Sequence, residues 1–159
     1  MTYSINTGDI FEVQLSDKKR YFQFIYKDDE YMAGHLIRAF IYANGIHEKP
    51  ELRELIQSNV DFYTYTRVIE GLKEGFWKRI SNVPIENDFN PPAFRQTNDV
   101  YSITPKSVNW FIWKGKFSTK QLIGKLTDKY KELPVSAIYP PKAIVRWLET
   151  GNNGFKIPG

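Results

Sequence analysis

The stretch 60-VDFYTYTRVIEGLKEGFWKRI-80 joins two kinds of hydrophobic pattern. Its first seven residues are mostly β-branched or aromatic, as in a β-strand. In the second half, Ile69, Leu72 and Phe76 recur at the spacing of one helix face, and Gly75 marks the end of that pattern. The stretch therefore predicts a strand followed directly by a short helix, which places most of its rings in a core.

Individual side chains of this stretch follow from the same pattern. Phe62 and Trp77 are predicted to be buried. Tyr63 and Tyr65 share one face of the strand, and the sequence leaves the exposure of that face open. Gly71 weakens the helix prediction, because glycine within a helix costs up to about 1 kcal/mol relative to alanine.

Upstream, three segments alternate apolar and polar residues with the period of two that marks strands. They span residues 8–15, 21–26 and 35–42, and a turn at 16–18 makes the first two a hairpin. The third segment has apolar residues on both faces. This pattern favours a strongly bent antiparallel sheet or an SH3-like barrel.

The other predicted elements complete an α+β fold with two or three short helices. A proline-rich loop follows residue 80, where proline, asparagine and aspartate cluster. We expect one domain over residues 1–159. The predicted elements are a short helix after Pro50, strands at 99–103, 107–114, about 121–126 and 135–138, and a helix at 139–151.

The composition limits the possible chemistry. The chain has no cysteine, and neither of its two histidines, His35 and His47, has the spacing of a metal-binding motif. No phosphate-binding glycine loop is present in the sequence. Asp61 opens an apolar strand, where an aspartate most often bonds a nearby backbone N–H. We therefore predict no enzymatic activity, no metal and no cofactor, and leave open a role for Asp61 or His35 beyond structure.

The distribution of charge and the length of the apolar runs indicate the partners and the location of the protein. Residues 1–103 carry 12 Lys and Arg against 15 Asp and Glu, whereas residues 104–159 carry 10 against 3. The dispersed lysines favour a solvated face over a nucleic-acid site. No apolar run approaches the roughly 18 residues of a membrane span. With the absence of cysteine, this predicts a soluble cytoplasmic protein without a membrane partner.

A nucleic-acid-binding module is the alternative function. Trp110 and Trp113, with Lys106, Lys114 and Lys116 nearby, would supply stacking rings and phosphate-binding charges on a small barrel. The opposing interpretation is a strand buried on both faces, which we favour because its four residues are all apolar. Nucleic acid is therefore an unlikely partner on the sequence alone.

Several segments, in order along the chain, form a recognisable pattern: GDIFEV at 8–13, RYFQFI at 20–25, the Ile-Arg-x-Phe at 37–40, VDFY at 60–63, GLKEGFWKRI at 71–80, Phe94-Arg95, the strand Trp110 to Trp113, and the YPP-helix-TG ending at 139–151. Together they resemble the Immunity protein 26 family of bacterial polymorphic-toxin systems. The chain departs from the family pattern at Tyr65, where a histidine is frequent, and at Ser81, where a glycine is frequent.

The resemblance implies a small cytoplasmic protein that binds a cognate toxin, commonly a nuclease, and neutralises it in a non-covalent complex. Such inhibition needs a complementary surface, often an acidic one where the toxin's substrate site is basic. Loops vary most freely and suit partner-specific contacts. The predicted toxin-binding residues lie in two polar loops, which we expect to be solvated: Asp28, Asp29 and Glu30 in one, Glu86 and Asp88 in the other.

Overall fold

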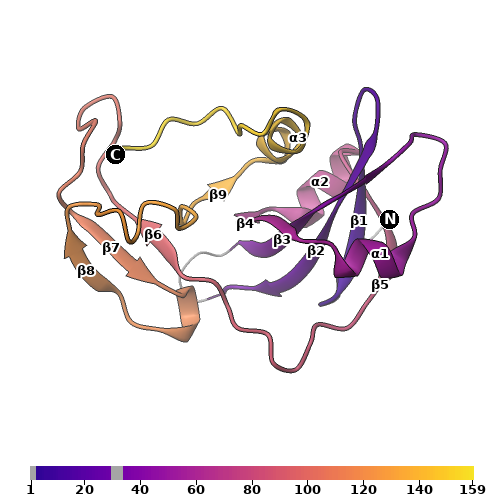
Figure 1. Ribbon diagram of the computed structural model, residues 1–159, viewed down its shortest axis with the longest axis horizontal. Helices are drawn as coiled ribbons and strands as arrows, with labels where there is room; N and C mark the ends of the chain where they lie inside the picture. Colours follow the sequence, from indigo (N-terminus) through magenta and orange to yellow (C-terminus); the bar gives the residue numbers. More distant parts are fainter. Residues whose placement is uncertain (1–2, 30–33) are drawn as a thin grey trace.

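The computed structural model describes residues 3–29 and 34–159. These residues form two sheets and three α-helices (Figure 1). The first sheet has the strand order β5-β1-β2-β3-β4-β9, and the second has the order β6-β7-β8. The elements are β1 (Asp9–Gln14), β2 (Lys19–Lys27), β3 (His35–Asn44), α1 (Leu52–Gln57), β4 (Val60–Thr66), α2 (Val68–Glu74), β5 (Lys78–Asn82), β6 (Phe94–Gln96), β7 (Trp110–Trp113), the 3-10 helix η1 (Gly115–Phe117), β8 (Gln121–Gly124), β9 (Ile138–Tyr139) and α3 (Pro141–Thr150).

The first sheet is mixed and open. Its strands pair antiparallel except β4 and β9, which run parallel. Register shifts interrupt the β1–β5, β2–β3 and β3–β4 pairs, and such irregularities bend and twist strands. The predicted α+β class is confirmed, and the register shifts are compatible with the predicted bent sheet. The sheet does not close into a barrel, because β5 and β9 remain as its two edges.

The stretch that decides the fold forms β4, α2 and the start of β5. Gly75 ends α2 in the left-handed conformation, with φ of 79°, and the chain then reverses. This reversal returns Trp77 to the helix, where its indole N–H donates to the carbonyl of Val68 at 2.9 Å. A Cβ atom at Gly71 would overlap the indole ring. The glycine that weakens the helix in isolation is therefore the residue that lets Trp77 pack against it.

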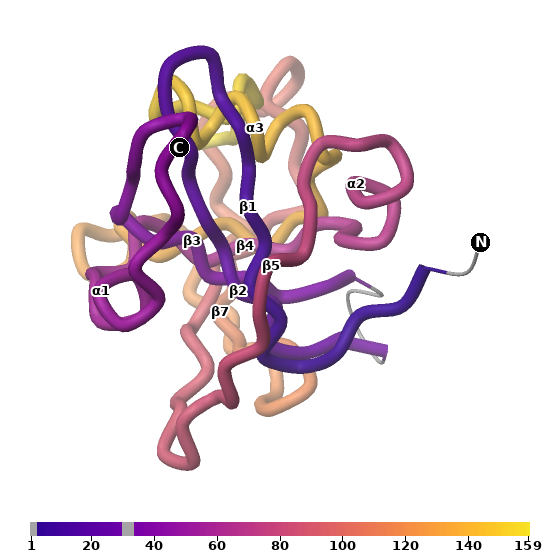
Figure 2. The backbone as a smooth tube through the Cα atoms, turned by 90° about the vertical axis from the view of Figure 1, so that its right-hand side faces the viewer, coloured from indigo at the N-terminus to yellow at the C-terminus, as the bar shows by residue number. Residues whose placement is uncertain are grey.

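Both faces of the first sheet are covered. One face packs Phe11, Phe22, Ile37 and Phe62 against α2, α3 and Trp77. The other face packs a separate cluster under α1, formed by Ile10, Tyr21, Phe40 and Leu55. Figure 2 shows α1 and α2 on opposite sides of the strands. A third cluster joins this sheet to β6 and is formed by Ile25, Leu36, Tyr65 and Phe94. The period-two alternation of the strands therefore places apolar residues on both faces of the sheet.

The predictions for the central stretch are partly confirmed. Phe62 and Trp77 are buried, and Tyr65 is buried while Tyr63 is half-buried. Within α2, the fully buried positions are Val68 and Gly71. The predicted stripe differs from this, since Ile69, Leu72 and Phe76 are each half-buried at the border of the core.

The second sheet lies at one end of the molecule's long axis (Figure 1). The predicted strand at 99–103 is wrong, because the N–H groups of Ile103 and Thr104 both donate to the carbonyl of Val100 and form a turn. Strand β7 pairs instead with β6 on one side and β8 on the other. Residues 135–138 were predicted as a strand, and there Val135 bridges to Arg95 while Ile138 begins β9.

Candidate functional site

A connected set of polar side chains lies on the α1 side of the first sheet. The side-chain amide of Gln23 donates to the carbonyls of Gly8 and Val83, at 3.2 and 2.7 Å. Arg38 donates through Nε to the side-chain oxygen of Gln23 at 2.9 Å. The two terminal nitrogens of Arg38 bond the two carboxylate oxygens of Glu86 at 2.7 and 2.8 Å. The loop after β5 is therefore tied to the sheet by a two-point ion pair.

The Arg38–Glu86 pair joins a buried cation to a half-exposed anion. Their side chains are 8% and 45% exposed, respectively. Hydrogen bonds from Arg38 lower the pKa of Glu86 to about 2, and they outweigh partial burial, which acts in the opposite direction. The Arg38 guanidinium also lies 5.6 Å from the centre of the Phe89 ring, in the same loop. Glu86, predicted as a toxin-binding residue, is therefore held in a fixed position.

Asp28 lies in the interior, contrary to the solvated position expected for its acidic turn. One of its carboxylate oxygens accepts the backbone N–H of Lys116 at 3.2 Å. A Cβ atom at Gly115, which has φ of 58°, would overlap that oxygen. The hydroxyl groups of Tyr26 and Tyr65 lie 3.2 Å apart close by, and burial raises the pKa of both. Asp28 therefore joins the first sheet to η1.

Of the other residues predicted to bind a toxin, two are exposed, and one lies outside the described part of the chain. Asp29 is exposed and pairs with Lys27 at 3.3 Å. Asp88 is exposed in the loop between β5 and β6. Glu30 lies outside the described residues.

The turn at η1 contacts both predicted segments. The N–H of Lys116 holds Asp28, and the Lys114 ammonium donates to the side-chain oxygen of Asn90 at 3.0 Å. Asn90 belongs to the loop that carries Glu86 and Asp88, which passes η1 (Figure 1). Two segments far apart in sequence are thus attached to one turn. We name the charged residues of these segments, all exposed except the half-buried Lys114, the loop surface: Asp29, Glu86, Asp88, Lys114 and Lys116.

Asp61 and His35 each have a structural partner. Asp61 accepts a hydrogen bond from Arg20 at 2.8 Å. The N–H of Val68, the first residue of α2, donates to Nδ1 of His35 at 3.0 Å. Burial lowers the pKa of His35, which favours the neutral ring that this acceptor role requires. Both side chains therefore support the packing of secondary structure.

The strand Trp110–Trp113 is buried on both faces, as predicted. Trp110 and Trp113 are 0% and 3% exposed. Arg95 covers the ring of Trp110 at 4.9 Å, and Lys120 lies 4.7 Å from the ring of Trp113. Stacking on nucleobases requires exposed rings. Neither indole offers such a face, so the structure lends no support to a stacking groove on this strand.

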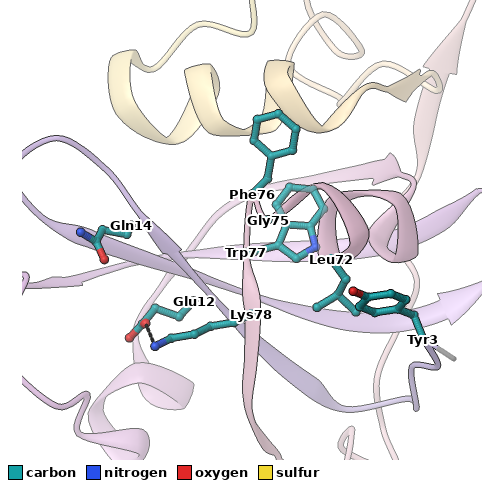
Figure 3. A pocket seen from close by; sticks show the side chains of 8 residues that line it. All are labelled: Tyr3, Glu12, Gln14, Leu72, Gly75, Phe76, Trp77 and Lys78. Carbon is teal, nitrogen blue, oxygen red and sulfur yellow. Dashed lines mark ion pairs between the residues drawn. The ribbon is translucent and has the colours of Figure 1, made fainter. Parts of the chain in front are cut away.

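A cavity of about 470 Å³ opens between β1 and α2 and was not indicated by the sequence (Figure 3). Glu12 lies at its side and pairs with Lys19 at 3.1 Å and Lys78 at 3.2 Å. Burial alone would raise the pKa of Glu12, but the bonds from the two lysines outweigh it and lower the pKa. The residues that line the cavity come from three separate parts of the chain, so no local pattern reveals it: Tyr3, Glu12, Gln14, Leu72, Gly75, Phe76, Trp77 and Lys78.

In residues 3–29 and 34–159, no group of three or more His, Asp or Glu side chains has the geometry to hold a metal ion. Within the same described part, none of the helices has the length and apolar character that a bilayer crossing needs.

Comparison with known proteins leaves the family open. No family model, curated protein or solved structure matches this chain. The resemblance to the Immunity protein 26 family therefore stays a prediction from the sequence.

Proposed function

We propose that this chain is an immunity protein that binds a cognate polymorphic toxin and neutralises it in a non-covalent complex. The observation that carries the proposal is the loop surface, whose two acidic segments are each bonded to the η1 turn, one through Asp28 and the other through Asn90. The sequence resemblance supplies the class of partner, and the loop surface supplies a place for it to bind.

The loop surface is suited to binding because its supports are buried. Glu86 is fixed by two hydrogen bonds from Arg38. The segment that carries Asp29 is fixed by the adjacent Asp28, which accepts the backbone N–H of Lys116. A surface held in its bound conformation loses less entropy on association, which favours affinity. Loops attached in this way combine sequence variability with fixed geometry.

The charges of the loop surface fit a partner of mixed charge. Glu86 and Asp29 are already paired with Arg38 and Lys27, Asp88 is exposed, and Lys114 and Lys116 lie beside the turn itself. A nuclease active site that binds phosphates offers basic side chains to Asp29, Glu86 and Asp88. The net charge of the whole chain, +4, does not oppose this contact, because charges beyond about 10 Å are screened at physiological salt.

The test uses the toxin domain encoded beside the gene for this chain, expressed with and without the chain in a bacterial host. We expect the chain to restore growth and to elute with the purified toxin domain. A variant carrying both Asp29→Lys and Asp88→Lys should weaken the complex at least about tenfold, because it places like charges against a basic partner.

The matched control is Glu74→Lys, which reverses an exposed acidic residue at the end of α2. Its affinity should equal that of the unmodified chain. A chain that fails to protect against the neighbouring toxin domain contradicts the proposed function. Protection with unchanged affinity in the double variant contradicts the loop surface as the interface.

A further inference from the structure

Part of strand β4 is an open edge of the first sheet. Strand β3 pairs with β4 along its length, whereas β9 pairs only with Tyr65 and Thr66 on the other side. In the described residues, no strand lies beside the outer edge of Val60–Tyr63. An open edge presents backbone N–H and C=O groups that an added strand can bond.

A groove runs along this edge. A cavity of about 310 Å³ is lined by four consecutive residues, Val60 to Tyr63. Side chains of successive strand residues point to opposite faces of a sheet, so four in a row line one cavity only where it follows the edge. The opposite wall is formed by Glu132, Pro134 and Trp147.

Aromatic rings form the floor of the groove and extend it. Phe62 and Trp147 stack at 3.8 Å with 3° between their planes, and Tyr139 meets Trp147 edge-on at 5.6 Å. Phe155, which is 53% exposed, continues the row at 5.3 Å from Tyr139. A second cavity of about 350 Å³ shares Glu132, Pro134 and Trp147 with the first, so Glu132 lies where the two meet. Phe62 and Tyr139 are buried and support the row from beneath, whereas Trp147 is half-buried and Phe155 is exposed. The groove is therefore longer than the four-residue edge, and Trp147 and Phe155 provide apolar contacts for side chains of a bound strand.

The charged residues that line the groove indicate which kind of bound strand it favours. At the β4 end, Asp61 and Glu132 line the cavity, and Asp61 remains 39% exposed although one oxygen bonds Arg20. At the far end, Arg95 and Lys131 line the second cavity. The groove thus favours a basic side chain at the β4 end. A second copy of this chain is disfavoured, because symmetric pairing of two edges would oppose the carboxylates of both copies.

We propose that the Val60–Tyr63 edge binds an extended segment of a partner protein, which adds a strand to the first sheet and places a basic side chain against Asp61 and Glu132. The aromatic row receives its apolar side chains. This groove is separate from the loop surface and carries no assumption that the partner is a toxin.

The probe is a phage-displayed library of linear peptides of about nine residues, panned against the full chain. We expect enriched peptides to contain Lys or Arg within an alternating apolar pattern. Binding of a synthetic enriched peptide should slow hydrogen exchange of backbone amides in residues 60–63. Its affinity is measured by fluorescence polarisation.

Two variants locate the basic contact. Glu132→Lys alters an exposed side chain and should weaken peptide binding about tenfold or more. Asp61→Asn keeps an oxygen acceptor for Arg20 while it removes the charge, and should also weaken binding. Glu74→Lys is the control and should bind as the unmodified chain does.

Three results would overturn the inference. They are a library that yields no enriched sequence, enriched peptides that bind the Glu132→Lys chain with unchanged affinity, and exchange protection that falls outside residues 60–63.

Discussion

The ion pair between Arg38 and Glu86 should make the stability of this protein depend on pH in the acidic range. The perturbation is Glu86→Gln, which preserves the size of the side chain and one oxygen acceptor but removes its charge. Because Arg38 is buried, the variant leaves a guanidinium without its counter-ion. The variant should therefore be less stable than the unmodified chain at neutral pH.

The size of the effect follows from the pKa of Glu86. A fall from the ordinary value of 4.5 to about 2 corresponds to roughly 3 kcal/mol at about 1.36 kcal/mol per pH unit. The carboxylate is 45% exposed, and solvent screening reduces such an interaction. We expect Glu86→Gln to lower the free energy of unfolding by about 1.5 kcal/mol at pH 7.

The sign of the pH dependence is fixed by the direction of the shift. The folded state lowers the pKa of Glu86, so the stabilisation is complete above the unfolded value of 4.5 and is lost as pH falls toward 2. The difference between the two chains should shrink by roughly half at pH 3.5. Urea unfolding at pH 7, 5, 4 and 3.5 measures the difference in the free energy of unfolding. The surface control Glu74→Gln should stay within about 0.5 kcal/mol of the unmodified chain. Equal stabilities at pH 7, or a difference that stays constant down to pH 3.5, would refute the reasoning.

Three further substitutions test the packing, each by urea unfolding. Gly71→Ala should cost about 2–3 kcal/mol, because the added methyl group overlaps the Trp77 ring. Gly115→Ala should cost about 2 kcal/mol, since φ is 58° and the methyl group overlaps the Asp28 carboxylate. Thr64→Val should instead stabilise by about 1 kcal/mol, because within the described residues the buried Thr64 hydroxyl has no hydrogen-bond partner. Unchanged stability in either glycine variant, or a loss in Thr64→Val, would contradict the corresponding contact.

The features that the sequence predicted well are those set by local periodicity. Alternation placed the first three strands, and the three-and-four spacing together with Gly75 placed α2 after β4. The run of four apolar residues from Trp110 to Trp113 correctly indicated a strand buried on both faces. In each case the information on the element type lies within a few neighbouring residues. The helix repeat did not identify the buried face of α2, which is formed by Val68 and Gly71.

The features that the sequence missed depend on partners far along the chain. Asp28 belongs to a polar turn by composition, yet Lys116 and Gly115 enclose it. Residues 99–103 have strand composition, but the side chain of Asp99 accepts from Ser107 Oγ at 2.6 Å and supports an irregular loop. Local composition carries no record of such contacts. The same limit applies to the groove. Periodicity identifies β4 as a strand, but it does not indicate which part of that strand pairs with another strand in the sheet.

The groove and the loop surface are separable because different segments support them. The wall of the groove at Pro134 is fixed by the N–H of Arg95, which donates to the Pro134 carbonyl at 2.9 Å, and by the packing of Trp147 on Phe62. The loop surface depends instead on Arg38 and Asp28. The two surfaces meet at Tyr63, which lines the groove and whose ring lies 6.4 Å from that of Phe89 in the loop of Glu86. Since Asp61, Glu132 and Trp147 make the main contacts of the groove, Glu86→Gln should change peptide affinity less than Glu132→Lys does. A loss of peptide binding in that variant would show that the two surfaces belong to one coupled site.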